Sequence, residues 1–317
     1  MRKYRQVTIA SITSLTMVFL ILNAKEASVF AADALTLCTA SLIPSLFPFM
    51  FLAIVLNSAL SGYRFRSLRI VKSLCRIPEG SEILFLLGVL GGYPVGAQLI
   101  ANTYYRGNLK KEDAQRMLGF CNNAGPSFIF GVIGPLFHSI TVPALLWTIQ
   151  ITSALITGAV LKGDSNTAIK ENCRSKISIT DTLEKSVKSM GLICGWVILF
   201  RIAAGFLQQY LSTHIPIDIL TIITGLLELT NGCIALYGIK NSGLRFILAS
   251  IFLTLGGMCV LLQTASSIKT LNIKTYIIGK SIQGIISIVL AYIIQRLIFK
   301  PEDCFISPHI SPLFTIF

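Results

Sequence analysis

Charged residues are scarce in this chain of 317 residues. Asp, Glu, Lys and Arg together make up 13% of it, whereas apolar residues make up 53% and the mean hydropathy is +0.73. A soluble protein of this length could not hide so much apolar surface, so a soluble enzyme, a disordered chain and a free nucleic-acid binder are excluded. The apolar runs lack the short alternation of an outer-membrane barrel. We therefore expect an all-α polytopic membrane protein that is not an enzyme.

Metal and redox motifs are lacking as well. The eight cysteines form no CxxC pair, and most lie in apolar runs, where they are typical small buried side chains. His138, His214 and His309 are too far apart in sequence to suggest a zinc site. We therefore expect no metal and no cofactor. The net charge of +13 is assigned to loops that orient the protein in the membrane, and no nucleic-acid partner is expected.

Long apolar runs predict the membrane segments. An N-terminal run over Val7–Leu22 is interpreted as a retained anchor helix. A cleaved signal peptide, with Val29–Ala32 as its cleavage context, is the alternative. Two of the later runs, 83–101 and 219–238, are interrupted by Gly91–Gly96 and by Glu228–Gly232. The further runs are 43–62, 118–137, 142–161, 189–208, 246–264 and 276–298.

Positive charge predicts how the interrupted runs sit in the membrane. Segments 63–77 and 106–117 are both strongly basic, so both are expected on the cytoplasmic side. The one run between them, 83–101, must then enter and leave by the same face, as a re-entrant hairpin. The same interpretation of 219–238 gives seven crossings and two hairpins. It also leaves 162–188 and 265–280 inside and the C-terminus outside.

The order span, re-entrant hairpin, broken span, span occurs twice, with breaks at Asn122 and Gly256. Each copy contains an odd number of crossings, so the second copy is expected to be inverted in the membrane. Inverted repeats with discontinuous helices are typical of transporters, whose substrate site lies where the breaks meet. The predicted organisation is an anchor helix and amphipathic segment at 1–42, a first repeat at 43–161, a cytoplasmic linker at 162–188, an inverted repeat at 189–298 and a tail at 299–317.

Polar residues inside apolar runs are the candidate site. Asn122 and Asn123 precede Pro126, which suits the start of a new helix whose free N–H groups would favour an anion; a structural kink is the alternative. Glu228 is the one acidic residue well inside an apolar run, with either a functional role or a local contact that caps the hairpin. Arg201 is its natural opposite charge, unless it snorkels to the interface. The predicted substrate-binding residues are Tyr93, Gly96, Gln98, Asn122, Asn123, Gly125, Ser127, Arg201, Glu228 and Asn231.

Two segments carry a resemblance to a known family. Gly91–Ala97 and Phe120–Pro126 closely resemble the YlbJ-type sporulation integral membrane proteins, and Leu227–Gly232 is similar more loosely. The resemblance covers about 40–298. It implies a nucleoside-recognition or gate domain, similar to part of concentrative nucleoside transporters. It also implies a role in spore cortex formation and in delivering dipicolinic acid from the mother cell across the outer forespore membrane.

The expected function is therefore a sporulation transporter that moves dipicolinate, a small aromatic dianion, by alternating access. Helix N-termini, asparagine amides and Arg201 suit its carboxylates, whereas Glu228 opposes an anion unless it is paired or protonated. A non-transporting scaffold for cortex assembly and a nucleoside or organic-solute carrier are the alternatives. The expected partners are this small anion and the lipid bilayer, and a homo-oligomer remains open.

Overall fold

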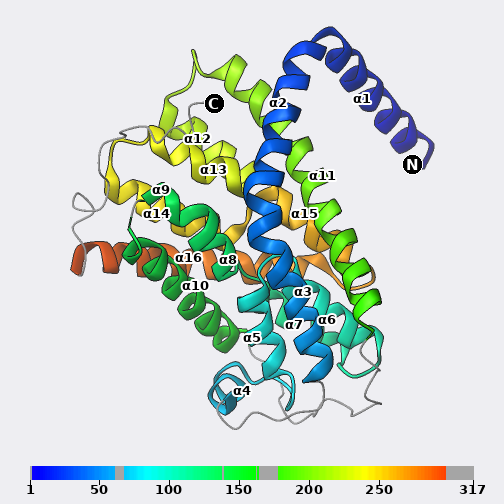
Figure 1. Ribbon diagram of the computed structural model, residues 1–317, viewed down its shortest axis with the longest axis vertical. Coiled ribbons are helices and arrows are strands. Elements are labelled where there is room, and N and C mark those ends of the chain that lie inside the picture. The colour runs from blue at the N-terminus through cyan, green and yellow to red at the C-terminus, as the bar shows by residue number, and fades with distance from the viewer. Residues whose placement is uncertain (1, 61–67, 138, 162, 164–177, 298–317) are drawn as a thin grey trace.

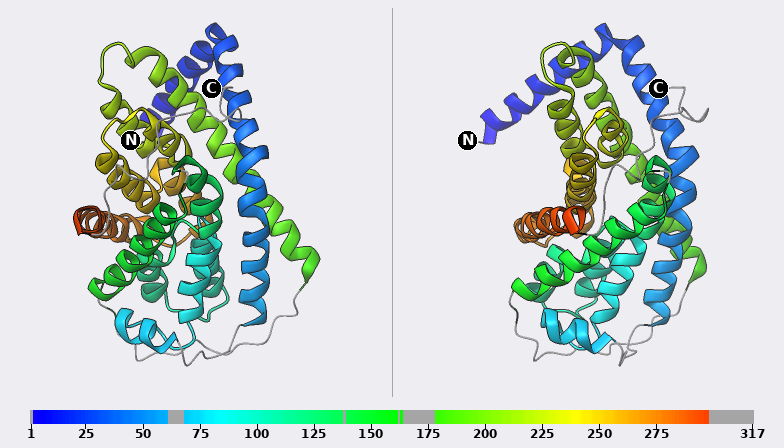
Figure 2. Two further views of the ribbon diagram at one scale, coloured as in Figure 1. Left: turned by 60° about the vertical axis from the view of Figure 1, so that its left-hand side comes forward. Right: turned by 90° about the vertical axis from the view of Figure 1, so that its left-hand side faces the viewer.

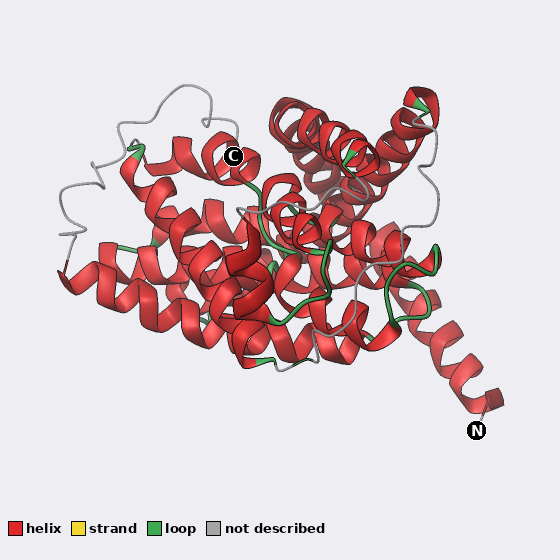
Figure 3. Cartoon of the chain, turned by 90° about the horizontal axis from the view of Figure 1, so that it is seen from below, coloured by secondary structure: helices red, strands yellow, loops and turns green. Residues whose placement is uncertain are grey.

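The computed structural model describes residues 2–60, 68–137, 139–161, 163 and 178–297. Throughout these residues every regular element is a helix, which confirms the all-α class (Figure 3). Five helices are long and apolar enough to cross a membrane, in agreement with a polytopic membrane protein. They are Ala24–Ala59, Thr141–Val160, Ile179–Leu211, Ser242–Ile268 and Ile273–Leu297.

Two of the seven expected crossings are not among these five helices. The N-terminal helix α1 (Arg2–Leu22) has a shorter apolar stretch, Gln6–Leu22, and the run 118–137 is interrupted in its middle. The number of crossings therefore remains a prediction. The described helices agree closely with the predicted runs 142–161, 246–264 and 276–298, whereas 43–62 and 189–208 are parts of longer helices.

One long helix joins the N-terminal segment to the first repeat. It consists of α2 (Ala24–Leu37), a π-helical turn (Cys38–Leu42) and α3 (Ile43–Ala59), and it is continuous over 36 residues (Figure 2). Pro44 has no N–H for an α-helical bond at this point, which favours the wider turn. The predicted boundary at residue 42 therefore falls inside a helix, as does the cleavage context Val29–Ala32.

The first predicted repeat continues with a helical hairpin and a broken helix. Helices α5 (Glu82–Gly91) and α6 (Val95–Tyr105) pack against each other and form the first hairpin. The helix that follows stops at Cys121 and resumes at Pro126, as predicted. Its parts are α7 (Lys111–Cys121), α8 (Pro126–Phe128), a π turn (Ile129–Ile133) and α9 (Gly134–Phe137), followed by the span α10 (Thr141–Val160).

The second repeat has the same order of elements. The span α11 (Ile179–Leu211) leads into the second hairpin, α12 (Ile217–Leu227) and α13 (Leu229–Ala235). A short 3-10 turn (Leu236–Gly238) precedes α14 (Ser242–Leu255) and α15 (Gly257–Ile268). Gly256 separates these two helices with a φ of 72°, a left-handed conformation that favours glycine, and α16 (Ile273–Leu297) completes the set.

The two hairpins lie at opposite ends of the molecule. The first hairpin lies at the same end as the basic helix α4 (Arg69–Cys75), and the second lies in the opposite half, toward the end where α1 joins α2 (Figures 1 and 2). The basic end is the one expected on the cytoplasmic side. The hairpins therefore point toward each other along the long axis of the protein.

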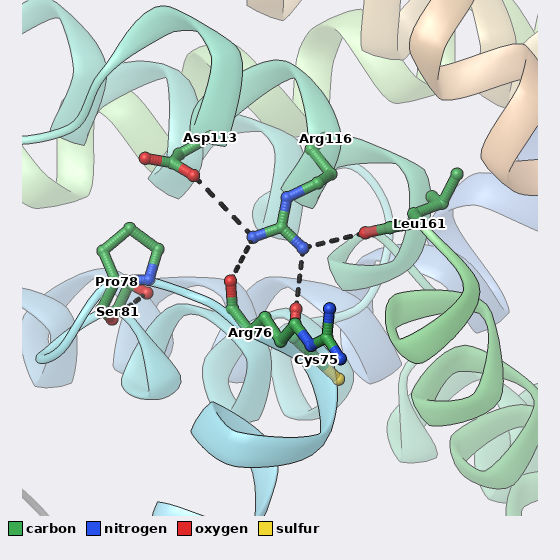
Figure 4. A network of polar contacts seen from close by, with 7 residues as sticks. All are labelled: Cys75, Arg76, Pro78, Ser81, Asp113, Arg116 and Leu161. Carbon is green, nitrogen blue, oxygen red and sulfur yellow. Dashed lines mark hydrogen bonds and ion pairs between the residues drawn. The ribbon is translucent and has the colours of Figure 1, made fainter. Parts of the chain in front are cut away.

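A buried arginine fixes the ends of two helices at the basic end. Arg116 is 8% exposed, and its guanidinium donates to the carbonyls of Cys75 at 2.7 Å, Arg76 at 2.7 Å and Leu161 at 3.0 Å (Figure 4). It also pairs with Asp113 at 3.7 Å. These carbonyls end α4 and α10 and have no partner within their own helices. Arg116 is thus a structural side chain, although its charge was used above to assign a cytoplasmic loop.

Candidate functional site

A central cavity of about 40 Å³ lies where both hairpin tips and both helix breaks meet. Tyr93 lines it from the first hairpin, Gly125 from the first break, Glu228 from the second hairpin and Cys259 from the helix after the second break. The side chains that line it from α3, its π turn and α11 are all apolar, while Thr230 and Gln263 add polar groups. A cavity of this size has room for a few water molecules but not for an aromatic dicarboxylate.

Close backbone contacts hold the tip of the first hairpin against the first break. A Cβ on Gly92 would lie 2.9 Å from the Gly125 nitrogen, and one on Gly96 would lie 2.4 Å from the Cys121 carbonyl oxygen. Gly92 also has a φ of 75°. Only glycine allows this approach. Gly96 and Gly125 therefore position the backbone of the site.

Tyr93 connects the first hairpin to the second repeat. It is 8% exposed, and its hydroxyl donates to the carbonyls of Thr254 at 2.8 Å and Leu253 at 3.3 Å. These carbonyls lie just before the break at Gly256. The ring forms a wall of the central cavity. Movement of the first hairpin must therefore break a bond to the opposite repeat.

The adjacent asparagines are fully buried and satisfy the broken backbone. The Asn122 carbonyl oxygen accepts the Ala97 N–H at 3.2 Å, and its amide donates to the Thr264 hydroxyl at 3.0 Å. The Asn123 amide donates to the Phe120 carbonyl at 2.7 Å. These are the contacts expected if the two asparagines stabilise a structural kink, which was the alternative to a binding role.

Lys280 is a buried cation that the sequence reasoning misassigned. It was counted with the cytoplasmic segment 265–280, but it lies inside α16 and is 4% exposed. Its ammonium donates to the side-chain oxygens of Asn123 at 3.0 Å and Gln283 at 2.8 Å, and it lies 5.1 Å from the centre of the Tyr93 ring. The helical spacing of Lys280, Gln283 and Ser287, all buried, was the signal available in the sequence.

A larger cavity, here called the vestibule, opens at the basic end. Its volume is about 320 Å³, within the range of ligand pockets. Gln98 lines it and donates to the Ser189 hydroxyl at 3.0 Å, which connects α6 to α11. Its lining includes four basic residues, and none of the described lining residues is acidic. The basic residues are Arg106, Lys185, Lys188 and Lys269.

A third space, here called the distal cavity, lies beside α13 and measures about 260 Å³. Arg201 and Asn231 line it together with Asp33 of α2. The Arg201 guanidinium pairs with Asp33 at 3.3 Å and donates to the Asn231 side-chain oxygen at 3.2 Å. Sequence reasoning missed Asp33, because it treated α2 as separate from the core.

Glu228 caps the second hairpin. The residue is 2% exposed, and its two carboxylate oxygens accept the backbone N–H groups of Thr230 at 3.0 Å and Asn231 at 2.7 Å. These are the first N–H groups of α13, so the carboxylate has both the position and the charge of a helix N-cap. This contact corresponds to the capping alternative, and it occurs at the edge of the central cavity.

The predicted site residues therefore do not form one pocket. Three of the ten line the central cavity, one lines the vestibule, two line the distal cavity, and four line none of these three spaces. In that order they are Tyr93, Gly125 and Glu228; Gln98; Arg201 and Asn231; and Gly96, Asn122, Asn123 and Ser127.

The long apolar helices and the polar breaks buried between them define an integral membrane protein with two helical hairpins. Among curated proteins, the chain is similar to the sporulation integral membrane protein YlbJ of Bacillus subtilis (strain 168). The two are 23% identical over an alignment of 313 residues, and the match covers 81% of this chain and 74% of that protein. No protein-family model and no solved structure matches the chain. The likeness agrees with the resemblance noted above, while the nucleoside-recognition domain remains a prediction.

Proposed function

We propose that this protein is a sporulation membrane transporter that moves dipicolinate by alternating access. The observation that supports this best is the meeting of both hairpin tips and both helix breaks at one cavity, between two larger spaces. Membranes tolerate non-helical backbone only where protein or water surrounds it, and transporters use such backbone at their substrate sites. A scaffold has no need of this arrangement.

The same helices line both the vestibule and the central cavity. On α15, Gln263 lines the central cavity and Ser267 lines the vestibule. On α11, Ile193 lines the central cavity and Ser189 lines the vestibule. Both helices therefore run from one space to the next. A substrate that leaves the vestibule would meet the lining of the central cavity after four residues, just over one helical turn or about 6 Å.

Buried charge favours an anionic substrate. Across the described part of the chain, no carboxylate forms an ion pair with Lys280, whose hydrogen-bond acceptors are two neutral amide oxygens. Burial among neutral groups disfavours a charged amine, so a protonated Lys280 and a bound anion would stabilise each other in this low-dielectric setting. Glu228 opposes an anion less than its charge suggests, because two backbone N–H groups bind its carboxylate. Dipicolinate, with two carboxylates and a ring, suits Lys280 and the Tyr93 ring.

The biological setting of this proposal rests on likeness. The Bacillus subtilis relative is named as a sporulation integral membrane protein. We extend that role to this chain, with the outer forespore membrane as its place and delivery of dipicolinate for cortex formation as its task. A gate domain related to nucleoside carriers is part of the same proposal, as is the absence of enzymatic activity.

The test is flux of radiolabelled dipicolinate into proteoliposomes that contain the full chain. Leu229 lines the central cavity, so Leu229→Cys in a cysteine-free background should lose flux when a methanethiosulfonate reagent modifies it. Dipicolinate should slow that modification. Lys274→Cys, at an exposed position of α16, is the control, and its modification should leave flux unchanged.

The alternatives give different results in the same assay. A scaffold gives no flux under any gradient, and a nucleoside carrier gives saturable uridine uptake that dipicolinate does not inhibit. Either result overturns the proposal. Asn122→Ala and Asn123→Ala are poor probes, because each removes a buried hydrogen bond, to Thr264 and to Lys280 respectively, and so confuses folding with transport.

A further inference from the structure

Three lysines line the vestibule, whereas no described acidic side chain lines it. Lys185 and Lys188 come from α11, and Lys269 comes from the end of α15. Within the described chain, none of the three forms an ion pair. Asp181 and Glu184 lie on the same stretch of α11 but do not line the vestibule. The cavity therefore presents positive charge on two sides.

The local backbone holds Lys269 at this cavity at a cost. Its φ is 42°, one of two positive values at non-glycine positions in the described residues. Such a conformation costs about 1 kcal/mol or more and persists where the surrounding structure fixes it. A glycine would have relieved the strain and removed the charge.

The lining suits a particular ligand chemistry. Beside the lysines, the vestibule offers hydroxyl and amide groups from Gln98, Asn102 and Ser189, and its volume of about 320 Å³ accommodates one small organic molecule. Cations with neutral donors around them recognise carboxylates, while a cation or a neutral nucleoside gains nothing from the charge. The match is to a compact dianion.

We infer that the vestibule is a separate capture site, in which Lys185, Lys188 and Lys269 concentrate a small organic dianion before it reaches the hairpin tips. This inference rests on the proposed function and deepens it: loading from the basic face is faster than loading from the opposite face. A cleft lined by charge of one sign raises the local concentration of the opposite ion and its rate of association. The capture site should therefore lower the Michaelis constant for substrate supplied to the basic face and leave that for the opposite face unchanged.

The expected change in KM is modest, because the charges that attract the substrate are exposed to solvent. Lys185 and Lys188 are exposed, so water and salt weaken their attraction. For a dianion at about one Debye length, removing both lysines should raise the KM from the basic face about 3- to 10-fold at low salt. The same change should have little effect in high salt.

The experiment measures initial rates of radiolabelled dipicolinate flux in proteoliposomes of known orientation, with substrate supplied to one face at a time. The variant is Lys185→Gln with Lys188→Gln, and Lys185→Arg with Lys188→Arg restores the charge. Lys274→Gln removes one exposed charge at the same end without touching the vestibule. All four proteins are compared for thermal unfolding, so that a folding defect is recognised.

The inference is supported if the Gln variant raises KM from the basic face alone, the Arg variant and Lys274→Gln match the parent chain, and added salt removes the difference. It is overturned if the Gln variant keeps the parent KM and salt dependence while the parent transports dipicolinate normally. In that case the proposed function stands. If the parent chain moves no dipicolinate from either face, both the proposed function and this inference are wrong.

Discussion

The two hairpins are built differently, although they occupy equivalent places in the two repeats. The first is held by backbone: Gly88 and Gly96 pack on the Cys121 carbonyl, and Gly92 packs on Gly125. The second packs tightly within itself, where a Cβ on Gly232 would lie 2.1 Å from the Gly225 Cα. Its packing on the second break is looser than that of Gly88 and Gly96 on the first, since a Cβ on Gly257 would lie 3.0 Å from the Gly225 carbonyl oxygen.

Side chains show the same difference. The tip of the first hairpin, Gly92–Pro94, carries no charged residue, while Glu228 sits at the tip of the second, whose Asn231 contacts the Arg201–Asp33 pair. Polar contacts break and re-form more easily than interlocked backbone, which has no room to shift. In the proposed transporter the second hairpin is therefore the better candidate for a moving gate, and the first is its fixed counterpart.

The largest expected effect comes from adding a methyl group to the first hairpin. In Gly96→Ala the new Cβ would meet the Cys121 carbonyl oxygen at 2.4 Å, and backbone cannot give way. We expect a loss of about 3 kcal/mol or more in stability. Gly225→Ala in the second hairpin would place its Cβ 2.3 Å from the Cζ of the buried Phe252 ring, so the whole ring must shift; because a side chain can shift where backbone cannot, it should cost less. Thermal unfolding in detergent measures both.

The control for that pair is Gly191→Ala on α11, where nothing lies within 4 Å. It should be neutral or raise stability by up to about 1 kcal/mol through helix propensity. A first hairpin that tolerates Gly96→Ala as well as α11 tolerates Gly191→Ala would contradict the fixed role assigned to it.

The next effect concerns the cap of the second hairpin. Glu228→Ala removes both acceptors of the Thr230 and Asn231 N–H groups and should cost about 2 kcal/mol, while Glu228→Gln keeps one acceptor and should cost about half as much. Hydrogen exchange of those two amides should accelerate in that order. Unchanged exchange in Glu228→Ala would mean that the carboxylate does not cap α13.

A smaller effect is expected from Tyr93→Phe. The ring and its contact with Lys280 remain, but the bonds to the Thr254 and Leu253 carbonyls are lost, at a cost of about 1 kcal/mol. Unfolding temperature is the measurement, with Tyr292→Phe at an exposed position of α16 as control. A drop as large as that of Gly96→Ala would show that the hydroxyl, and not the glycine contacts, holds the first hairpin.

The smallest effect on stability is expected from Asp33→Asn. Both side chains of the Asp33–Arg201 pair are partly exposed, so their interaction is worth about 0.5 kcal/mol and weakens with salt. A double-mutant cycle with Arg201→Gln at low and high salt measures it. A coupling above about 2 kcal/mol would argue that α2 holds the second hairpin firmly in place.

Sequence reasoning located the hairpins and breaks because glycine and proline mark them locally. The interruption at Asn122 and the glycine at Gly256 are visible in the sequence, and the structure places the helix ends at Cys121 and Leu255. The partners of those residues were not visible. Thr264, which binds Asn122, lies 142 positions away, and no local pattern connects the two.

For two basic residues, counting positive charges predicted the wrong surroundings. The rule that places Lys and Arg in cytoplasmic loops does not ask what each side chain contacts, so it placed Arg116 and Lys280 in water. The carbonyl ends of α4 and α10 bind the first, and Asn123 and Gln283 bind the second. Both sets of partners come together only through tertiary packing.

The narrowness of the central cavity has a consequence for the cell. With about 40 Å³ at the hairpin tips, the central cavity in this conformation holds a few water molecules and no organic substrate. In the proposed transporter this narrow space would resist leakage of protons and small ions through an energised membrane. Each transport event would then require a rearrangement of helices on a microsecond-to-millisecond timescale, so turnover would be that of a carrier and not of a pore.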